Sequence, residues 1–313
     1  MRARVALSAA VAAVALSAAA EAQAPPPPIS PPPPAPVPAP TPVPVPVPAP
    51  TGNFGGGALV APPNAHFGPG NAVVAVRALP ERKLEIEATV RASCAGGDVA
   101  AGATVAADGS FSAKGTERTE PERGVKVTTT YTMAGTFSTP SAADGTLSAT
   151  IERRARGRTR RCRTGSVAFG VRRPAGTIGT AGKQLRTRYY GTTSQRGAGP
   201  RRPIVLRLSG DGLVISRALF GESVRCSDHT RSTGIDAPRT NARIDARGRV
   251  DDHERYEIKQ GNALVKVDDR FTAQLGSAGA RGTFSLSDRT IDRTTGRVLQ
   301  SCKSGEITWT AEP

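Results

Sequence analysis

Arginine is concentrated in one short stretch of the chain, and clustered guanidinium groups are suited to binding anions. The segment from Ile151 to Gly165 holds seven Arg residues and one acidic residue. A guanidinium group can donate two parallel hydrogen bonds to a phosphate or carboxylate, and neighbouring cations raise a positive potential around them. The segment therefore predicts a polyanion-binding loop whose cations are Arg153, Arg154, Arg156, Arg158, Arg160 and Arg161.

The whole chain is basic, which leaves a second interpretation of this segment open. Lys and Arg number 42 against 26 Asp and Glu, and 35 of the 42 are Arg, beside abundant Ala, Gly and Pro. A coding sequence rich in G and C gives the same bias. The segment has no aromatic residue, whereas proteins that bind single-stranded nucleic acids interleave aromatic and basic side chains. We therefore expect anionic polymers of the cell envelope as partners, and no intracellular nucleic acid.

Two clusters carry residue types that are used in catalysis. Ser227, Asp228 and His229 are consecutive, and consecutive strand residues point to opposite faces, so they do not converge as a triad. Asp251-Asp252-His253-Glu254 is the best candidate for a metal or acid–base site, with Asp268-Asp269 opposite it. The alternative is an exposed hairpin whose acids pair with Arg. We expect no enzyme activity, no metal and no cofactor, and a hydrolase at 251–254 is the least favoured hypothesis.

The sequence motifs of the elements that position these residues occur twice in the chain. CRTGSVAFG at 162–170 matches CKSGEITWT at 302–310, each with Cys, then Ser or Thr, Gly, a β-branched aliphatic and an aromatic residue. Residues 104–111 match 243–250, where each copy has a two-residue loop with Gly second, a signal for a hairpin. Residues 143–149 match 280–286. Such matches at several places indicate a duplication.

Strands dominate both copies. From Lys83 to Cys94, apolar residues alternate with charged ones, which is typical of a half-buried antiparallel strand. We predict an all-β protein of two tandem homologous antiparallel domains, each a sandwich or small barrel of roughly seven short strands. The first domain is expected at 71–175, the joint at 176–183 and the second domain at 184–313.

Four cysteines occupy matching places in the two copies, one pair in each. The repeat and the signs of export favour disulfides between Cys94 and Cys162 and between Cys226 and Cys302. Zinc sites bring ligands in close pairs such as C-x-x-C, which this chain lacks. Each bridge closes a loop of about 70 residues, worth about 4 kcal/mol in the chain-entropy model.

The Gly of the repeated motif is predicted to break the strand. Cys302 and Ile307 are five residues apart, and a regular strand would point them to opposite faces. If both are buried, the alternation must shift between them. Gly165 and Gly305 are placed for a β-bulge with positive φ.

A resemblance rests on further motifs in the second half. Tyr189-Tyr190-Gly191-Thr192-Thr193-Ser194-Gln195, Arg225-Cys226-Ser227-Asp228 and the closing Cys-x-Ser-Gly-x-Ile-x-Trp resemble a group of secreted actinobacterial proteins with this repeated β domain. The resemblance covers most of 189–313 and, more weakly, 84–172, where Phe169 replaces Trp. It implies an exported, β-rich domain. It carries over no functional residues, because that group has no assigned activity.

The N-terminal segment directs export. Arg2 and Arg4 precede an apolar run, and Ala20-Glu21-Ala22 fits signal peptidase, so 1–22 is predicted to be a signal peptide. After cleavage no transmembrane span is expected, and the alternative is an uncleaved anchor. Residues 23–70 are predicted to be a disordered Pro/Gly-rich linker, because Pro fills 16 of the 26 positions from 25 to 50 and favours polyproline II.

These patterns predict a secreted, non-catalytic binding or structural protein of the cell envelope, with attachment to the cell wall as one option. Its Arg-rich loop would contact anionic polymers. The alternative function is a small-molecule carrier, which requires an apolar cavity inside a barrel.

Overall fold

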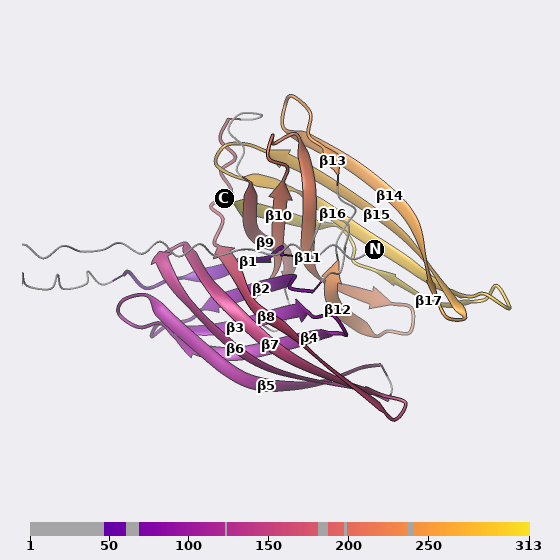
Figure 1. The fold of residues 1–313 in the computed structure, drawn as a ribbon. Helices are drawn as coiled ribbons and strands as arrows, with labels where there is room; N and C mark the ends of the chain where they lie inside the picture. Colours follow the sequence, from indigo (N-terminus) through magenta and orange to yellow (C-terminus); the bar gives the residue numbers. More distant parts are fainter. Residues whose placement is uncertain (1–46, 61–68, 123, 181–186, 197–198, 237–240) are drawn as a thin grey trace, which may run out of the picture. The chain divides into compact units, whose positions relative to one another are not determined.

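The computed structural model describes residues 47–60, 69–122, 124–180, 187–196, 199–236 and 241–313. The predicted signal peptide, residues 23–46 and 61–68 of the predicted linker, and residues 181–183 of the predicted joint lie outside these ranges. Within them every regular element is a β-strand, and the fold is all-β with two antiparallel sheets, as predicted (Figure 1). A search of the described residues finds no helix with the length and apolar character needed to cross a membrane.

The first domain is one eight-stranded sheet that curls into a barrel. The strands follow the order β4-β3-β2-β1-β8-β7-β6-β5, so β1 pairs with β8, and β4 and β5 form the two edges. The strands are β1 (Gly52–Ala58), β2 (Ala72–Ala78), β3 (Lys83–Arg91), β4 (Gly96–Thr104), β5 (Ser110–Glu122), β6 (Val125–Thr139), β7 (Ala142–Ala155) and β8 (Arg158–Arg172).

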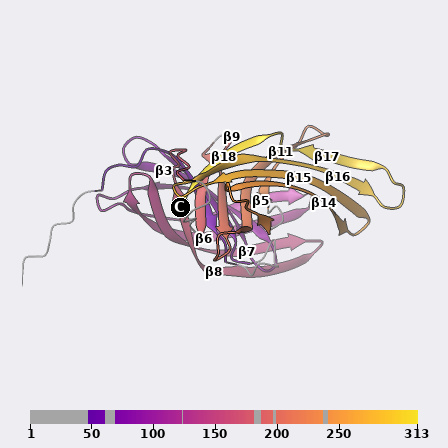
Figure 2. The same cartoon turned by 90° about the horizontal axis from the view of Figure 1, so that it is seen from above.

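The second domain repeats this order. Its ten-stranded sheet runs β12-β11-β10-β9-β18-β16-β15-β14, and β17 pairs with both β11 and β16. In both views the long strands β6, β7 and β8 run side by side, as do β14, β15 and β16 (Figures 1 and 2). The strands are β9 (Arg188–Arg196), β10 (Arg201–Leu208), β11 (Val214–Cys226), β12 (Arg231–Asp236), β13 (Ala242–Arg243), β14 (Arg249–Gln260), β15 (Ala263–Leu275), β16 (Ala280–Asp292), β17 (Val298–Lys303) and β18 (Ile307–Glu312).

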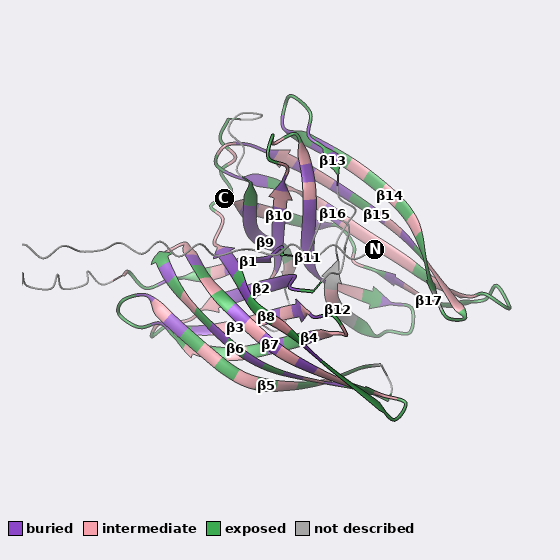
Figure 3. Cartoon of the chain, in the orientation of Figure 1, coloured by how far each residue is buried: buried purple, intermediate pink, exposed green. Residues whose placement is uncertain are grey.

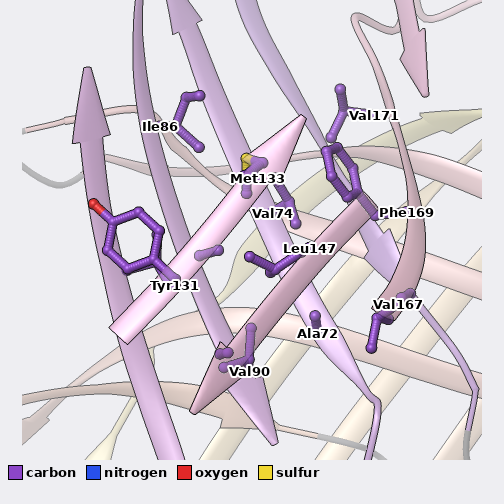
Figure 4. Close-up of a cluster of buried hydrophobic side chains, with 14 of the residues drawn as sticks. Ala72, Val74, Ile86, Val90, Tyr131, Met133, Leu147, Val167, Phe169 and Val171 are labelled. Carbon is purple, nitrogen blue, oxygen red and sulfur yellow. The ribbon is translucent and has the colours of Figure 1, made fainter. Parts of the chain in front are cut away.

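Alternation along the strands fills the core. In β3 every second residue from Leu84 to Val90 is buried, as the sequence predicts (Figure 3). Side chains of β2, β3, β6, β7 and β8 meet in one apolar cluster, which includes Ile86, Met133 and Leu147 (Figure 4). Burying a side chain of this size stabilises the fold by about 1.5–3 kcal/mol relative to leaving it in water.

The first domain begins earlier than predicted. Residues 52–58, expected to belong to a disordered linker, form β1 between β2 and β8, which gives eight strands instead of about seven. A Cβ on Gly55 would lie 2.0 Å from the carbonyl oxygen of Gly191, and one on Gly56 would lie 2.1 Å from that of Gly170. The Gly-rich stretch predicted to be a flexible loop is therefore a strand in which Gly permits close backbone approach.

The approach of Gly55 to Gly191 belongs to an interface between the two domains. Leu59, Val73, Tyr190, Val205 and Leu219 form a buried apolar cluster of their own. At its edge, Arg202 Nη1 lies 2.9 Å from Glu87 Oε2, and the amide of Arg201 donates to Asn53 Oδ1 at 3.2 Å. Both domains therefore contribute side chains to one apolar contact.

The predicted hairpin turns are present, but they do not join paired strands. The amide of Gly109 donates to Ala106 O at 3.0 Å and that of Gly248 to Asp245 O at 2.9 Å, with φ of 85° and 75° at the two Gly residues. The first turn links β4 to β5, which lie at opposite ends of the strand order. The expected hairpin is therefore the place where the curled sheet turns from one edge to the other.

Both predicted disulfides are confirmed. Cys94 is bonded to Cys162, and Cys226 to Cys302. In the second domain the bridge joins residues that face each other in β11 and β17. Two disulfides fit an extracellular protein.

The predicted phase shift is confirmed in both copies of the motif. Gly165 has φ of 71° and Gly305 of 70°. Cys302 and Ile307 are both buried although they are five residues apart. The hydroxyl preceding each Gly accepts the amide of the facing strand: Leu286 N to Ser304 Oγ is 2.8 Å and Ala149 N to Thr164 Oγ1 is 2.9 Å. A side-chain oxygen thus supplies the acceptor where the ladder is interrupted.

Candidate anion-binding site

The Arg-rich segment is a β-hairpin, not the predicted loop. Residues up to Ala155 belong to β7, and β8 starts at Arg158. The turn consists of Arg156 and Gly157, with φ of 48° and 71°. Positive φ at both central residues is typical of a type I′ turn, whose twist suits a two-residue hairpin. The arginines therefore have fixed positions in a ladder.

The ladder sorts the predicted residues onto two faces. Arg153 is opposite Arg160, and Ala155 is opposite Arg158. These residues lie on the same face of the hairpin as Ile151 and Cys162, a buried pair that lies further from the turn. Since successive residues alternate, Arg154 and Arg161 lie on the other side.

A groove lies beside the first of these faces. It has a volume of about 900 Å³ and is formed by the β7–β8 tip and the start of β6. The described residues that line it are Gly124, Val125, Arg153, Ala155, Arg156, Arg158 and Arg160. None of these residues is acidic. We call it the hairpin groove. The sequence did not point to Gly124 and Val125, because only the fold brings the β5–β6 connection to this tip.

The opposite face differs in its charge. Arg154 Nε lies 2.7 Å from Glu152 Oε1, and Arg161 is opposite Glu152 in the ladder. Arg163, opposite Thr150, also lies on this face. The structure thus brings four of the six predicted arginines to one groove and leaves the other two beside a carboxylate.

The acidic cluster at 251–254 is divided between the two faces of β14. Asp251 lies 3.4 Å from Arg270 Nη2, and His253 Nε2 lies 3.0 Å from Asp268 Oδ1, both at exposed positions. Glu254 is opposite Asp269 in the ladder, on the other face. Hydrogen bonds from His253 and Arg255 hold the pKa of Asp268 below its ordinary value. The exposed acids therefore sit in ion pairs along the strand, and the four residues do not converge.

Asp228 has a role in a turn. Its carboxylate accepts the amide of Thr230 at 3.0 Å and the hydroxyl of Thr230 at 2.6 Å, and Gln300 Nε2 donates to it at 2.9 Å. These bonds lower the pKa of Asp228. The carboxylate is occupied by the connection between β11 and β12.

The centres of both barrels contain aromatic side chains. In the first domain Phe137 packs against Phe54 at 5.3 Å between ring centroids. In the second domain Phe220 stacks on Phe284 at 4.5 Å and Phe271 on Trp309 at 5.6 Å. These rings pack against one another within the apolar cores of the two domains, so the clusters give the carrier hypothesis no support.

No known protein family matches the chain, and no curated protein matches its sequence. The resemblance to secreted actinobacterial proteins stays a prediction from the motifs.

Proposed function

We propose that this protein is a non-catalytic binding protein of the cell envelope that holds anionic polymers in the hairpin groove. The observation that carries the proposal is the gathering of Arg153, Arg156, Arg158 and Arg160 around one groove whose described lining includes no carboxylate. A short two-residue turn and a paired ladder fix these side chains at their Cα atoms, which lowers the entropy lost on binding.

The chemistry of the groove suits phosphate or carboxylate groups spaced along a chain. Each guanidinium can hold an oxyanion through two hydrogen bonds, and the apolar Val125 and Ala155 offer no acceptor that would compete. Binding of this kind is driven largely by release of counterions, so it weakens steeply with salt. It is not selective for the sequence of the polymer.

The predicted export and the two disulfides agree with a partner outside the cytoplasm. The predicted Pro-rich spacer would hold the two domains away from a membrane or wall layer. Wall polymers bearing phosphate and acidic polysaccharides are the partners of this chemistry.

Two matched variants test the proposal. One changes Arg153, Arg158 and Arg160 to Ser on the groove side, and the other changes Arg154, Arg161 and Arg163 to Ser on the opposite side. Both remove three positive charges from the same hairpin. We expect the first to lose retention on isolated cell envelope and on immobilised linear polyphosphate at moderate salt, and the second to keep most of it.

Equal loss in the two variants would mean that only total charge matters, and the groove would have no role. Equal retention of both variants and the wild type would mean that the Arg content reflects coding bias. The far-ultraviolet circular dichroism spectrum of each variant checks that the strands are intact.

A further inference from the structure

A second groove, of about 1130 Å³, lies on the second domain. Its walls come from β9, β18, β16, β15 and β14, which follow one another in the sheet, and from β10, β13 and the connection after β13. We call it the β14–β18 groove. It involves no residue of the β7–β8 hairpin.

Five guanidinium groups line this groove. They belong to Arg196, Arg201, Arg243, Arg249 and Arg281. Within the part of the chain that the structure describes, none of these five side chains takes part in an ion pair. Arg249 is oriented by Gln274, whose Oε1 lies 3.3 Å from its Nε. The groove thus presents several cations whose charges no described carboxylate neutralises.

The two acidic residues of the lining are already engaged. Asp245 Oδ1 accepts the amides of Arg247 and Arg249, each at 2.8 Å, and so closes its own turn. Asp251 is paired with Arg270 across the strand. Because both carboxylates have partners, the groove favours an anionic ligand.

Hydroxyl groups and a tryptophan complete the lining. Ser194, Thr308 and Thr310 lie beside the arginines, and Trp309 forms part of the floor. Trp309 is 2 % exposed and alternates with Thr308 and Thr310 along β18, so its ring lies on the core side of the sheet, stacked on Phe271.

The first domain has a groove at the corresponding place, of about 580 Å³, without these cations. By the alignment of the two copies, six of its lining residues correspond to Arg243, Asp245, Arg249, Asp251, Gln274 and Arg281. Those six are Thr104, Ala106, Ser110, Ser112, Thr136 and Asp144. Three small or acidic residues are thus replaced by Arg. The duplicated fold alone does not produce the charges, because only one copy has them.

We infer that the β14–β18 groove is a second binding site, for a short anionic chain that also bears hydroxyl groups. Guanidinium groups recognise phosphate or carboxylate, and the Thr, Ser and Gln side chains can exchange hydrogen bonds with hydroxyls. The volume exceeds the range of about 300–1000 Å³ that is usual for small-molecule pockets, so several linked units fit better than one ion. A phosphorylated polyol and an acidic oligosaccharide share this chemistry.

Trp309 gives a direct test, because it is the only Trp of the chain. Oligomers of poly(glycerol phosphate) and of polyuronate are titrated separately into the mature, disulfide-bonded protein while Trp fluorescence is recorded, with neutral dextran as a control. We expect a saturable change in emission with at least one anionic oligomer and none with dextran. The oligomer that acts identifies the source of the anion.

Two double variants locate the effect. Arg249→Ser with Arg281→Ser removes exposed cations of the groove and should weaken the response roughly 10-fold or more, the usual scale for a lost charge-assisted hydrogen bond. Arg153→Ser with Arg160→Ser removes the same charge from the hairpin and should leave the response unchanged. The inference is overturned by silence with both anionic oligomers, by an equal response to dextran, or by equal loss in the two variants.

The same pair of variants separates this site from the proposed function. Loss of envelope retention in the hairpin variant with a preserved Trp309 response would support both sites independently. If the hairpin variant keeps its retention on cell envelope, while the Trp309 response is lost only in the Arg249 and Arg281 variant, the hairpin groove is not a binding site and the β14–β18 groove is.

Discussion

Arg153 and Arg160 are directly opposite each other in the β7–β8 ladder. Like charges at directly opposite positions destabilise a sheet, by up to about 1 kcal/mol, and less where solvent screens them. The first domain thus keeps a repulsive pair in a hairpin that would fold better without it. This is expected where the two cations serve a ligand.

Replacing one member of this pair should separate stability from binding. Arg160→Thr removes the repulsion and adds a residue of high β propensity, so we expect the midpoint of thermal unfolding to stay or rise slightly. Retention on polyphosphate should fall. Calorimetry and a retention assay on the same preparation measure the two effects.

The neighbouring residue supplies the control for this experiment. Arg161 faces Glu152 instead of a cation, so Arg161→Thr removes an attractive pair and should lower the midpoint slightly while retention changes little. If Arg160→Thr and Arg161→Thr change the midpoint of unfolding alike and also change retention alike, the assignment of the two arginines to different faces is wrong.

The hydroxyl of Ser304 is predicted to stabilise the second domain. It accepts the amide of Leu286 at 2.8 Å and donates to Gly305 O at 2.7 Å. Ser304→Ala removes both bonds and should lower the free energy of unfolding by about 1 kcal/mol, as for a typical hydrogen bond. Ser304→Thr keeps a hydroxyl, as Thr164 does in the first domain, and is expected to retain most of the stability that Ser304→Ala loses. Urea titrations measure the free energy of unfolding of the three proteins.

The backbone at Gly305 makes a different prediction. Its φ of 70° lies in the left-handed region, and no atom would touch an added Cβ. Gly305→Ala should therefore cost about 1–2 kcal/mol through backbone strain alone. Gly210→Ala is the matched control, because that site is equally open but needs no positive φ. An equal effect at the two sites would contradict the role assigned to the bulge.

A half-buried acid, Asp288, should make the second domain sensitive to pH. Burial raises the pKa of Asp288, which faces Cys302 across β16 and β17. The folded state then binds this proton more tightly than the unfolded state, so stability falls as the pH rises through the folded pKa. Asp288→Asn lacks this penalty and should unfold at a higher temperature than the wild type near neutral pH.

The difference in unfolding temperature between Asp288→Asn and the wild type should vanish below a pH of about 3.9, the pKa of Asp in the unfolded state, because the carboxyl is then protonated in both states. Thermal unfolding of the two proteins from pH 3 to 8 measures it. A constant difference over that range would mean that Asp288 acts through packing and not through its charge.

Local repeats explain why part of the fold was predictable. The pairing of Cys94 with Cys162, and the positive φ at Gly165 and Gly305, follow from a short motif that occurs twice, so each copy constrains the other. β1 was missed for a physical reason: Gly55 and its neighbours have no side chain to reveal alternation, and their role is a close approach to Gly191.

The candidate sites were less predictable, because they depend on register. Sequence shows that Arg153 and Arg154 are both basic, but only the ladder, which pairs Arg153 with Arg160 and Arg154 with Thr159, shows which side chains share a face with each of them. The β14–β18 groove combines Arg196 of β9, Arg249 of β14 and Arg281 of β16, which only the folded sheet brings to one groove. No spacing in the sequence marks such a groove.

The most direct test of the proposed function is the salt dependence of binding to a linear polyphosphate. The logarithm of the binding constant is measured against the logarithm of the salt concentration for the wild type and for the variant with Ser at 153, 158 and 160. At about 0.7 released ions for each phosphate neutralised on a flexible strand, three lost contacts should reduce the slope by roughly 2. The variant with Ser at 154, 161 and 163 should keep a slope near that of the wild type. Identical slopes for all three proteins would contradict the assignment of the hairpin groove.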